Sequence, residues 1–240
     1  MSNRVAQKAA HKEAARLRRE QQARAERRQR TLWVSAVALI VLLAAGLIGY
    51  STWRSDEPVG AVAPAGTTAD GTGLAVGTGP VEVEVYLDFM CPACQQFDAA
   101  ARPILDEYLA DGAITLVYRP IAILDRATTT EYSTRAAAAA GAAADGGRVD
   151  EFVGAMMARQ PAQGTAGLSD EEIIEIGQGV GLTGSGFAAD VREGTYRDWA
   201  VSNSNAAADR GVTGTPTVFV DGSQIELSLG ALIGAIEAAG

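Results

Sequence analysis

The feature that most constrains this chain is an uncharged, apolar stretch at residues 31–53. Leu, Val, Ile and Ala dominate residues 32–50 within it. A helix rises about 1.5 Å per residue, so about 20 such residues cross a hydrocarbon core of about 30 Å. Trp33, Tyr50 and Trp53 lie near its two ends, where aromatic side chains favour the membrane interface. Residues 31–53 are therefore predicted to form one transmembrane helix.

The charge differs sharply on the two sides of this stretch. Residues 1–30 hold ten of the twenty Lys and Arg residues against three acids, a charge of about +7. Because the whole chain carries −9, the remainder carries about −16. Lys and Arg accumulate on the cytoplasmic side of membrane helices. Residues 1–30 are therefore predicted to be a basic cytoplasmic tail, and the C-terminal body is predicted to lie outside the cytoplasm, at the cell membrane.

Two alternatives apply to this N-terminal region. A basic tail can bind nucleic acid, but its interleaved Glu and Gln residues and its place before an apolar stretch favour a helix near the anionic inner leaflet. A cleaved signal peptide is the alternative to a retained membrane anchor, because Ala61-Val62-Ala63 has the small-x-small pattern of a cleavage site. The length of the apolar run, the long basic leader and Pro64 directly after that site favour an anchor that is retained.

The exported part divides into a linker and a domain. Residues 54–79 are rich in Gly, Ala, Thr and Pro and lack apolar periodicity, which predicts a flexible linker. Residues 80–240 are enough for one domain with its own core. Apolar and polar residues alternate over 81–87 as in a strand, 91–110 reads as a helix, and 114–118 reads as a second strand. This order implies a parallel pair with a right-handed crossover.

The rest of the domain is predicted to be mainly helical. Residues 128–210 lack strand patterns, and the alanine block at 136–144 indicates a closely packed helix, because Ala has the highest helix propensity. Ser169 and Glu172 match a capping box at the start of a further helix.

The C-terminal part is predicted to return to the sheet. Residues 217–227 read as a hairpin around Asp221 and Gly222, and a last helix follows up to residue 239. The order is β-α-β, helical block, β-β-α, which is an α/β domain.

The chain has two cysteines, Cys91 and Cys94, which stand in a Cys-Pro-Ala-Cys (CPAC) motif where the first strand meets the first helix. Unpaired N–H groups and the dipole at a helix N-terminus favour a thiolate over a thiol. Cys94, one turn further on, is placed to resolve a mixed disulfide formed by Cys91. Pro92 fits the first helical turn, where its missing N–H costs nothing. The motif therefore predicts a redox-active pair.

Other functions of the pair are less favoured. Zinc needs about four ligands, and His11, the one histidine, lies in the predicted cytoplasmic tail. A structural disulfide across so short a loop removes little entropy from the unfolded chain. A thiol-based metal-delivery or binding module usually adds His or Met beside the cysteines, and only Met90 adjoins them, where packing is the more common role. No metal or cofactor is expected.

Two segments carry a family resemblance. Residues 88–97 (DFMCPACQQF) and 211–222 (GVTGTPTVFVDG) resemble the signature segments of DsbA-like, thioredoxin-fold thiol-disulfide oxidoreductases. The resemblance covers about residues 80–240 and implies a thioredoxin-like fold with an inserted helical domain at about 128–193. It also implies a cis peptide bond before Pro216, in a loop beside the cysteines. An ordinary strand entry is the alternative for this proline.

The same resemblance implies the activity. Cys91 and Cys94 are the expected redox disulfide, and Thr215 and Pro216 complete the expected catalytic site. The implied reaction introduces disulfides into exported proteins, whose thiols are the substrates, and a membrane-bound redox partner reoxidises the pair. A disulfide reductase or isomerase of the same fold is the alternative, because the reduction potential sets the direction of electron flow. No nucleic acid is expected as a partner.

The chain departs from the family pattern in two ways. The dipeptide between the cysteines contains no histidine, so activation of Cys91 must come from the helix terminus and backbone donors. Relatives often carry a buried acid six positions before the reactive cysteine, and Val85 stands there. Glu84 and Asp88 lie close in sequence but on the opposite face of the strand, where solvated acids rather than a proton relay are expected.

Overall fold

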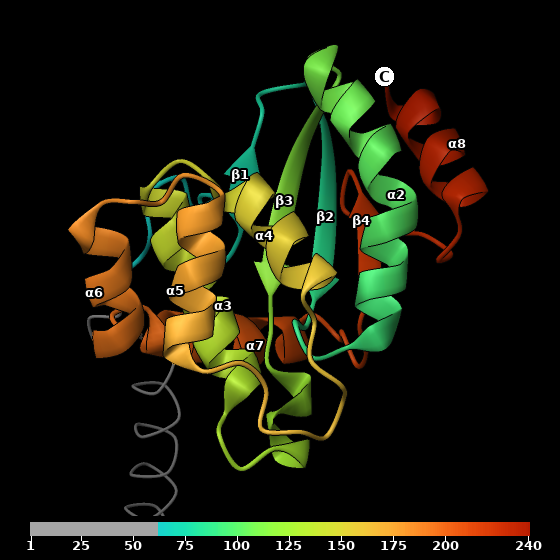
Figure 1. Cartoon of the computed structure of the whole chain (residues 1–240). Coiled ribbons are helices and arrows are strands. Elements are labelled where there is room, and N and C mark those ends of the chain that lie inside the picture. Colours follow the sequence, from blue (N-terminus) through green and yellow to red (C-terminus); the bar gives the residue numbers. More distant parts are fainter. Residues whose placement is uncertain (1–61) are drawn as a thin grey trace, which may run out of the picture. The chain divides into compact units, whose positions relative to one another are not determined.

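The computed structural model describes residues 62–240 (Figure 1). The predicted basic tail at 1–30 and transmembrane helix at 31–53 lie outside these residues. Among the helices of residues 62–240, none is long and apolar enough to cross a membrane.

A mixed five-stranded sheet forms the centre of the domain, in the order β1-β3-β2-β4-β5. β2 and β3 are parallel, which confirms the predicted crossover, and β4 runs antiparallel to β2. In this register Val85 of β2 pairs with Tyr118 of β3 and Val218 of β4. The strands are β1 (Leu74–Val76), β2 (Val81–Leu87), β3 (Ile114–Pro120), β4 (Thr217–Val220) and β5 (Ser223–Gln224).

Helices cover the sheet and form the insertion between β3 and β4. The crossover helix α2 (Pro92–Ala110) and the last helix α8 (Leu229–Ala239) lie on the same side of the sheet in Figure 1. The remaining helices are the 3-10 helix η1 (Ile123–Ala127), α3 (Tyr132–Asp145), α4 (Val149–Ala158), α5 (Asp170–Gly179), α6 (Ser185–Glu193) and α7 (Arg197–Asp209).

Alternate residues of β2 reach two apolar clusters. Val83 and Val85 belong to the main core together with Leu105 of α2 and Leu232 of α8. Tyr86 belongs to a second cluster, which includes Phe219 of β4 and Ala207 of α7. The period-two alternation of β2 therefore separates side chains facing α2 and α8 from those facing α7.

The helical block follows the sequence patterns closely. In α3 nearly every alanine is buried, as the alanine block predicted. α5 begins with Ser169 as N-cap, and its hydroxyl and the Glu172 side chain form the predicted reciprocal capping box.

The prediction of a flexible linker over residues 54–79 is wrong for residues 74–76, which form β1. This strand pairs antiparallel with β3, and Leu74 opposite Tyr118 is fully buried. An ion pair of 3.0 Å between Asp70 and Arg119 of β3 holds the segment before it. Three residues are too few to show alternation among glycines, so the sequence pattern gives no sign of this strand.

The expectation that Glu84 is a solvated acid is also wrong, because its side chain is buried. Two oxygens of its carboxylate accept hydrogen bonds of 2.6 and 2.7 Å from Arg210, and Arg119 forms a second ion pair with it. Although burial opposes ionisation, the Arg210 hydrogen bonds and the Arg119 charge lower the pKa of Glu84. The two guanidinium groups replace the water that the carboxylate loses.

Candidate active site

The loop after β2 carries Cys91 to the start of α2, where it is the N-cap and Pro92 is the first helical residue. Both cysteines are free thiols in the structure, Cys91 partly exposed and Cys94 only 2% exposed. The backbone N–H of Cys91 donates to the Asp88 carbonyl oxygen at 2.9 Å, and the N–H of Cys94 donates to the Cys91 carbonyl oxygen at 3.0 Å. Cys91 is thus presented at the surface, with Cys94 beneath it.

The loop before β4 lies against this motif. The peptide bond between Thr215 and Pro216 is cis. The Cys91 Sγ atom lies 3.3 Å from the Thr215 carbonyl oxygen, to which its thiol donates. Pro216 and Cys94 line one small cavity. The structure therefore brings together all four residues that the sequence singled out, although 124 positions separate Cys91 from Thr215.

The pKa values of the two thiols are shifted in opposite directions. A hydrogen bond from the Cys94 thiol, with further stabilisation by the Thr215 side chain and the N–H groups of Cys94 and Ala93, outweighs burial and lowers the pKa of Cys91 from 9.0 to about 5. The same bond to Cys91, together with burial, raises the pKa of Cys94 far above its usual value. At neutral pH the reduced pair therefore consists of a thiolate at Cys91 and a thiol at Cys94.

Asp88 is fully buried, so the expectation of a solvated acid is wrong here as well. Its carboxylate accepts hydrogen bonds from the N–H groups of Met90 and Leu124, both at 2.9 Å, and from the Ser133 hydroxyl at 2.6 Å. Burial raises its pKa despite these donors. Its own backbone N–H lies 3.5 Å from the Cys94 sulfur. Asp88 therefore joins the loop before Cys91 to η1 and α3.

Two glutamines that sequence reasoning missed connect the motif to α4. The Gln160 side-chain amide donates to the Cys91 carbonyl oxygen at 2.9 Å, and the Gln95 side-chain amide donates to the Met157 carbonyl oxygen at 3.0 Å. No sequence pattern marks Gln160, because its contact depends on how the insertion folds back over the motif.

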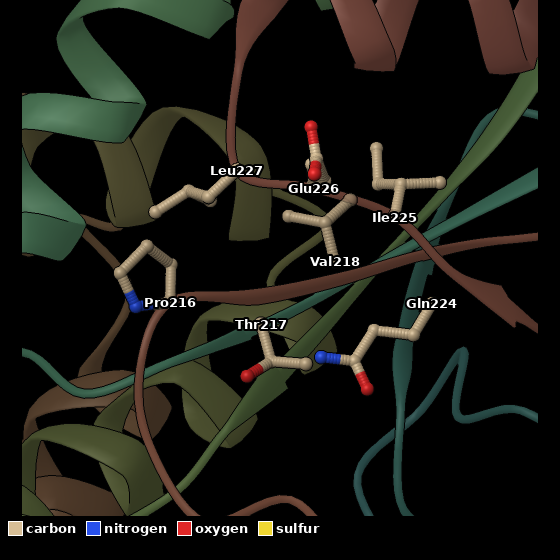
Figure 2. Close-up of a pocket in the computed structure, with 7 residues that line it drawn as sticks. All are labelled: Pro216, Thr217, Val218, Gln224, Ile225, Glu226 and Leu227. Carbon is tan, nitrogen blue, oxygen red and sulfur yellow. The ribbon is translucent and has the colours of Figure 1, made fainter.

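A groove of about 480 Å³ runs beside the cis proline. Figure 2 shows Pro216 and Leu227 at one end of this groove and Gln224 at the other. Leu227 is 51% exposed, unusual for a large apolar side chain. The groove offers apolar contacts beside the cis proline, and the residue before that proline, Thr215, contacts the Cys91 sulfur.

Within residues 62–240, no group of three or more His, Cys, Asp or Glu side chains is arranged to hold a metal ion.

The chain is similar to known proteins in both sequence and fold. Residues 70–238 match the family described as Thioredoxin. The chain is similar to the oxidised crystal structure of DsbA from Mycobacterium tuberculosis, with 30% identity, a TM-score of 0.63, and coverage of 70% of this chain and 92% of that one. DsbG from the same organism, described as a disulfide bond oxidoreductase, gives 30% identity, a TM-score of 0.63, and coverage of 70% and 88%.

A curated relative is the Na(+)/H(+) antiporter NhaA 3 of Salinispora tropica, 29% identical over 143 residues, or 60% of this chain. The chain spans only 20% of that relative's length. The match to the family over residues 70–238, the likeness to the two mycobacterial oxidoreductases and the paired thiols lead to one conclusion. The chain belongs to the thioredoxin family and is a thiol-disulfide oxidoreductase of the DsbA type.

Proposed function

We propose that this oxidoreductase acts as an oxidase, which introduces disulfides into exported proteins through Cys91 and Cys94. The observation that carries the proposal is the position of Cys91, partly exposed at the N-terminus of α2 above the buried Cys94, where the Cys94 thiol and backbone N–H groups lower its pKa to about 5. A thiolate that is stable at neutral pH stabilises the reduced pair. A pair with a stable reduced form gives its disulfide away readily, because its reduction potential is high.

The two cysteines have different roles in this reaction. A substrate thiolate attacks the Cys91 sulfur of the oxidised pair, the bond between Cys91 and Cys94 breaks, and Cys94 leaves with the electron pair. A second substrate thiolate attacks the substrate sulfur of this mixed disulfide, so that Cys91 leaves as a thiolate. The substrate loses two electrons and the pair gains them. A membrane-bound redox partner would accept these electrons and restore the disulfide.

The surroundings of Cys91 favour a polypeptide as substrate. Pro216 and Leu227 border a groove that can accept an extended segment beside the cis-proline loop, whose Thr215 contacts the Cys91 sulfur. We place this reaction outside the cytoplasm, with residues 31–53 as the membrane anchor and the N-terminus in the cytoplasm, because the basic residues lie wholly before that stretch.

The redox equilibrium of the pair with glutathione tests the direction. We expect a potential near the oxidising end of the range for thioredoxin-fold proteins, which spans about 150 mV, or about 7 kcal/mol for two electrons. A potential near the reducing end would reject the oxidase and support the alternative, a reductase or isomerase.

Trapping of mixed disulfides tests which cysteine attacks the substrate and which one resolves the mixed disulfide. The Cys94→Ser variant should accumulate mixed disulfides between Cys91 and substrate thiols, because the resolving sulfur is absent. The Cys91→Ser variant should lose both activity and trapping. Covalent complexes are counted on non-reducing gels after incubation with an unfolded protein that contains disulfides, one of which the Cys91 thiolate attacks and breaks to form the mixed disulfide. Trapping by the Cys91→Ser variant alone would show that the roles are reversed.

A further inference from the structure

Cys94 must exchange a proton in each catalytic cycle, although its side chain is only 2% exposed. When Cys94 attacks a mixed disulfide its thiol must lose a proton, and its raised pKa makes this loss costly. When the Cys91–Cys94 disulfide opens, the departing sulfur must gain a proton. A buried thiol therefore needs a nearby group that carries the proton to and from solvent.

A small cavity beside Cys94 is lined by titratable side chains. The cavity, about 10 Å³, has room for about one water molecule. Two titratable side chains, Asp98 and Tyr118, line it together with the thiol. Its other walls are apolar and include Val85, the strand position at which the sequence lacks an acid. Asp98 follows Cys94 by one helical turn, so both lie on one face of α2.

Of the two titratable neighbours, Asp98 is the better proton acceptor. The Tyr118 hydroxyl is committed as a donor to the Asp150 carboxylate at 2.5 Å, and burial raises its pKa well above the usual value. The Asp98 side chain is 18% exposed, so it connects the cavity to solvent. Asp88 lies near the pair, but it does not line this cavity, and its fully buried side chain gives no path to solvent.

Asp98 shares its positively charged partner with a second acid. Arg102 forms ion pairs of 2.7 Å with Asp98 and 2.9 Å with Asp150, so two carboxylates share one guanidinium group. Asp106, a further acid of α2, adds negative charge close to the same group, and its pKa is raised by partial burial and by Asp150. Arg102 therefore balances only part of the negative charge beside the cavity.

We propose that Asp98 takes the proton of the Cys94 thiol when Cys94 attacks the mixed disulfide at Cys91. The Cys94 thiolate forms the bond to the Cys91 sulfur, the bond between Cys91 and the substrate sulfur breaks, and the substrate leaves as a thiolate. In the opposite direction protonated Asp98 returns the proton to Cys94 as the disulfide opens. The inference rests on the proposed roles of the two cysteines.

An aromatic disulfide that releases a coloured thiolate, a dithiobis-nitrobenzoate, tests this in one stopped-flow experiment on the reduced, full-length protein. The first release reports the attack by Cys91, and the second release reports the attack by Cys94 on the mixed disulfide. In the Asp98→Asn variant, which keeps an acceptor for Arg102, we expect an unchanged first phase. The second phase should slow by about 100-fold at neutral pH and recover only as the pH rises.

Two further variants separate proton transfer from a structural effect, each compared at temperatures where thermal melts show folded protein. Asp98→Glu should restore the second phase, and Glu107→Gln, which removes an exposed acid of the same helix, should alter neither phase. A second phase in Asp98→Asn within about twofold of wild type at all pH values would overturn the proposal. So would a slow second phase in both Asp98→Asn and Asp98→Glu. Loss of the first phase in the unaltered protein would instead reject the proposed role of Cys91.

Discussion

At the scale of single residues, the difference between Cys91 and Cys94 comes from one hydrogen bond and from unequal burial. The Cys94 thiol stabilises the Cys91 thiolate, and Cys94 itself stays protonated. No histidine between the cysteines is needed, because the neighbouring thiol and the backbone donors at the helix N-terminus provide the stabilisation.

This arrangement predicts the pH dependence of alkylation. Because the pKa of Cys91 is about 5, its rate of reaction with iodoacetamide should stay nearly constant from high pH down to about 6 and fall below about 5. The thiolate also stabilises the reduced protein; this stability is fully present above pH 9.0 and is lost as the pH falls through about 5. In Cys94→Ala the midpoint should rise, because the thiol that donates to the Cys91 thiolate is removed. A midpoint near 9.0 in the wild type would contradict the prediction.

Glu84 gives a second prediction at this scale. The Glu84→Gln substitution leaves Arg119 and Arg210 without their shared buried carboxylate, and should lower the free energy of unfolding by about 3 kcal/mol. Urea denaturation of the oxidised protein measures this loss in the free energy of unfolding. Glu82, two positions earlier on β2, is the matched control, because burial raises its pKa and its charge is unfavourable. Equal losses in Glu84→Gln and Glu82→Gln would contradict this account.

At the scale of elements, β1 differs from the prediction made from the sequence, which placed residues 74–76 in a flexible linker. If residues 74–76 belonged to a flexible linker, Leu74→Ala would leave stability unchanged. Because Leu74 is fully buried in the main core, the substitution should cost about 3 kcal/mol. The exposed neighbour Ala75 provides the control, since Ala75→Ser should change little. Thermal or urea denaturation of the two variants decides between strand and linker.

The elements also show where sequence reasoning succeeds. Residues 81–87 and 91–110 were predicted closely because alternation and helix-start signals are local. The burial of Glu84 and Asp88 was missed, because the arginines and donors that hold them come from distant segments. Asp98 could have been found from its spacing of one helical turn after Cys94. The contact of Gln160 with Cys91 depends on tertiary packing alone.

At the scale of the whole molecule, the proposed topology makes Cys91 reachable from outside the cell. A membrane-impermeant maleimide should therefore label Cys91 in intact cells whose surface has been reduced, at the level seen after lysis. The Cys91→Ser variant controls for other sites, because the buried Cys94 should react slowly. Labelling only after lysis would place the domain in the cytoplasm and reject the proposed location.

The Asp88 carboxylate has a consequence for motions of the domain. One group accepts hydrogen bonds from Met90 in the redox loop, from Leu124 in η1 and from Ser133 in α3. If any of these three partners moves away, the buried Asp88 carboxylate loses a hydrogen-bond donor that water cannot replace. Local unfolding of the insertion and loosening of the redox loop should therefore be a single cooperative event, in which the Met90 and Leu124 amides exchange hydrogen at the same rate.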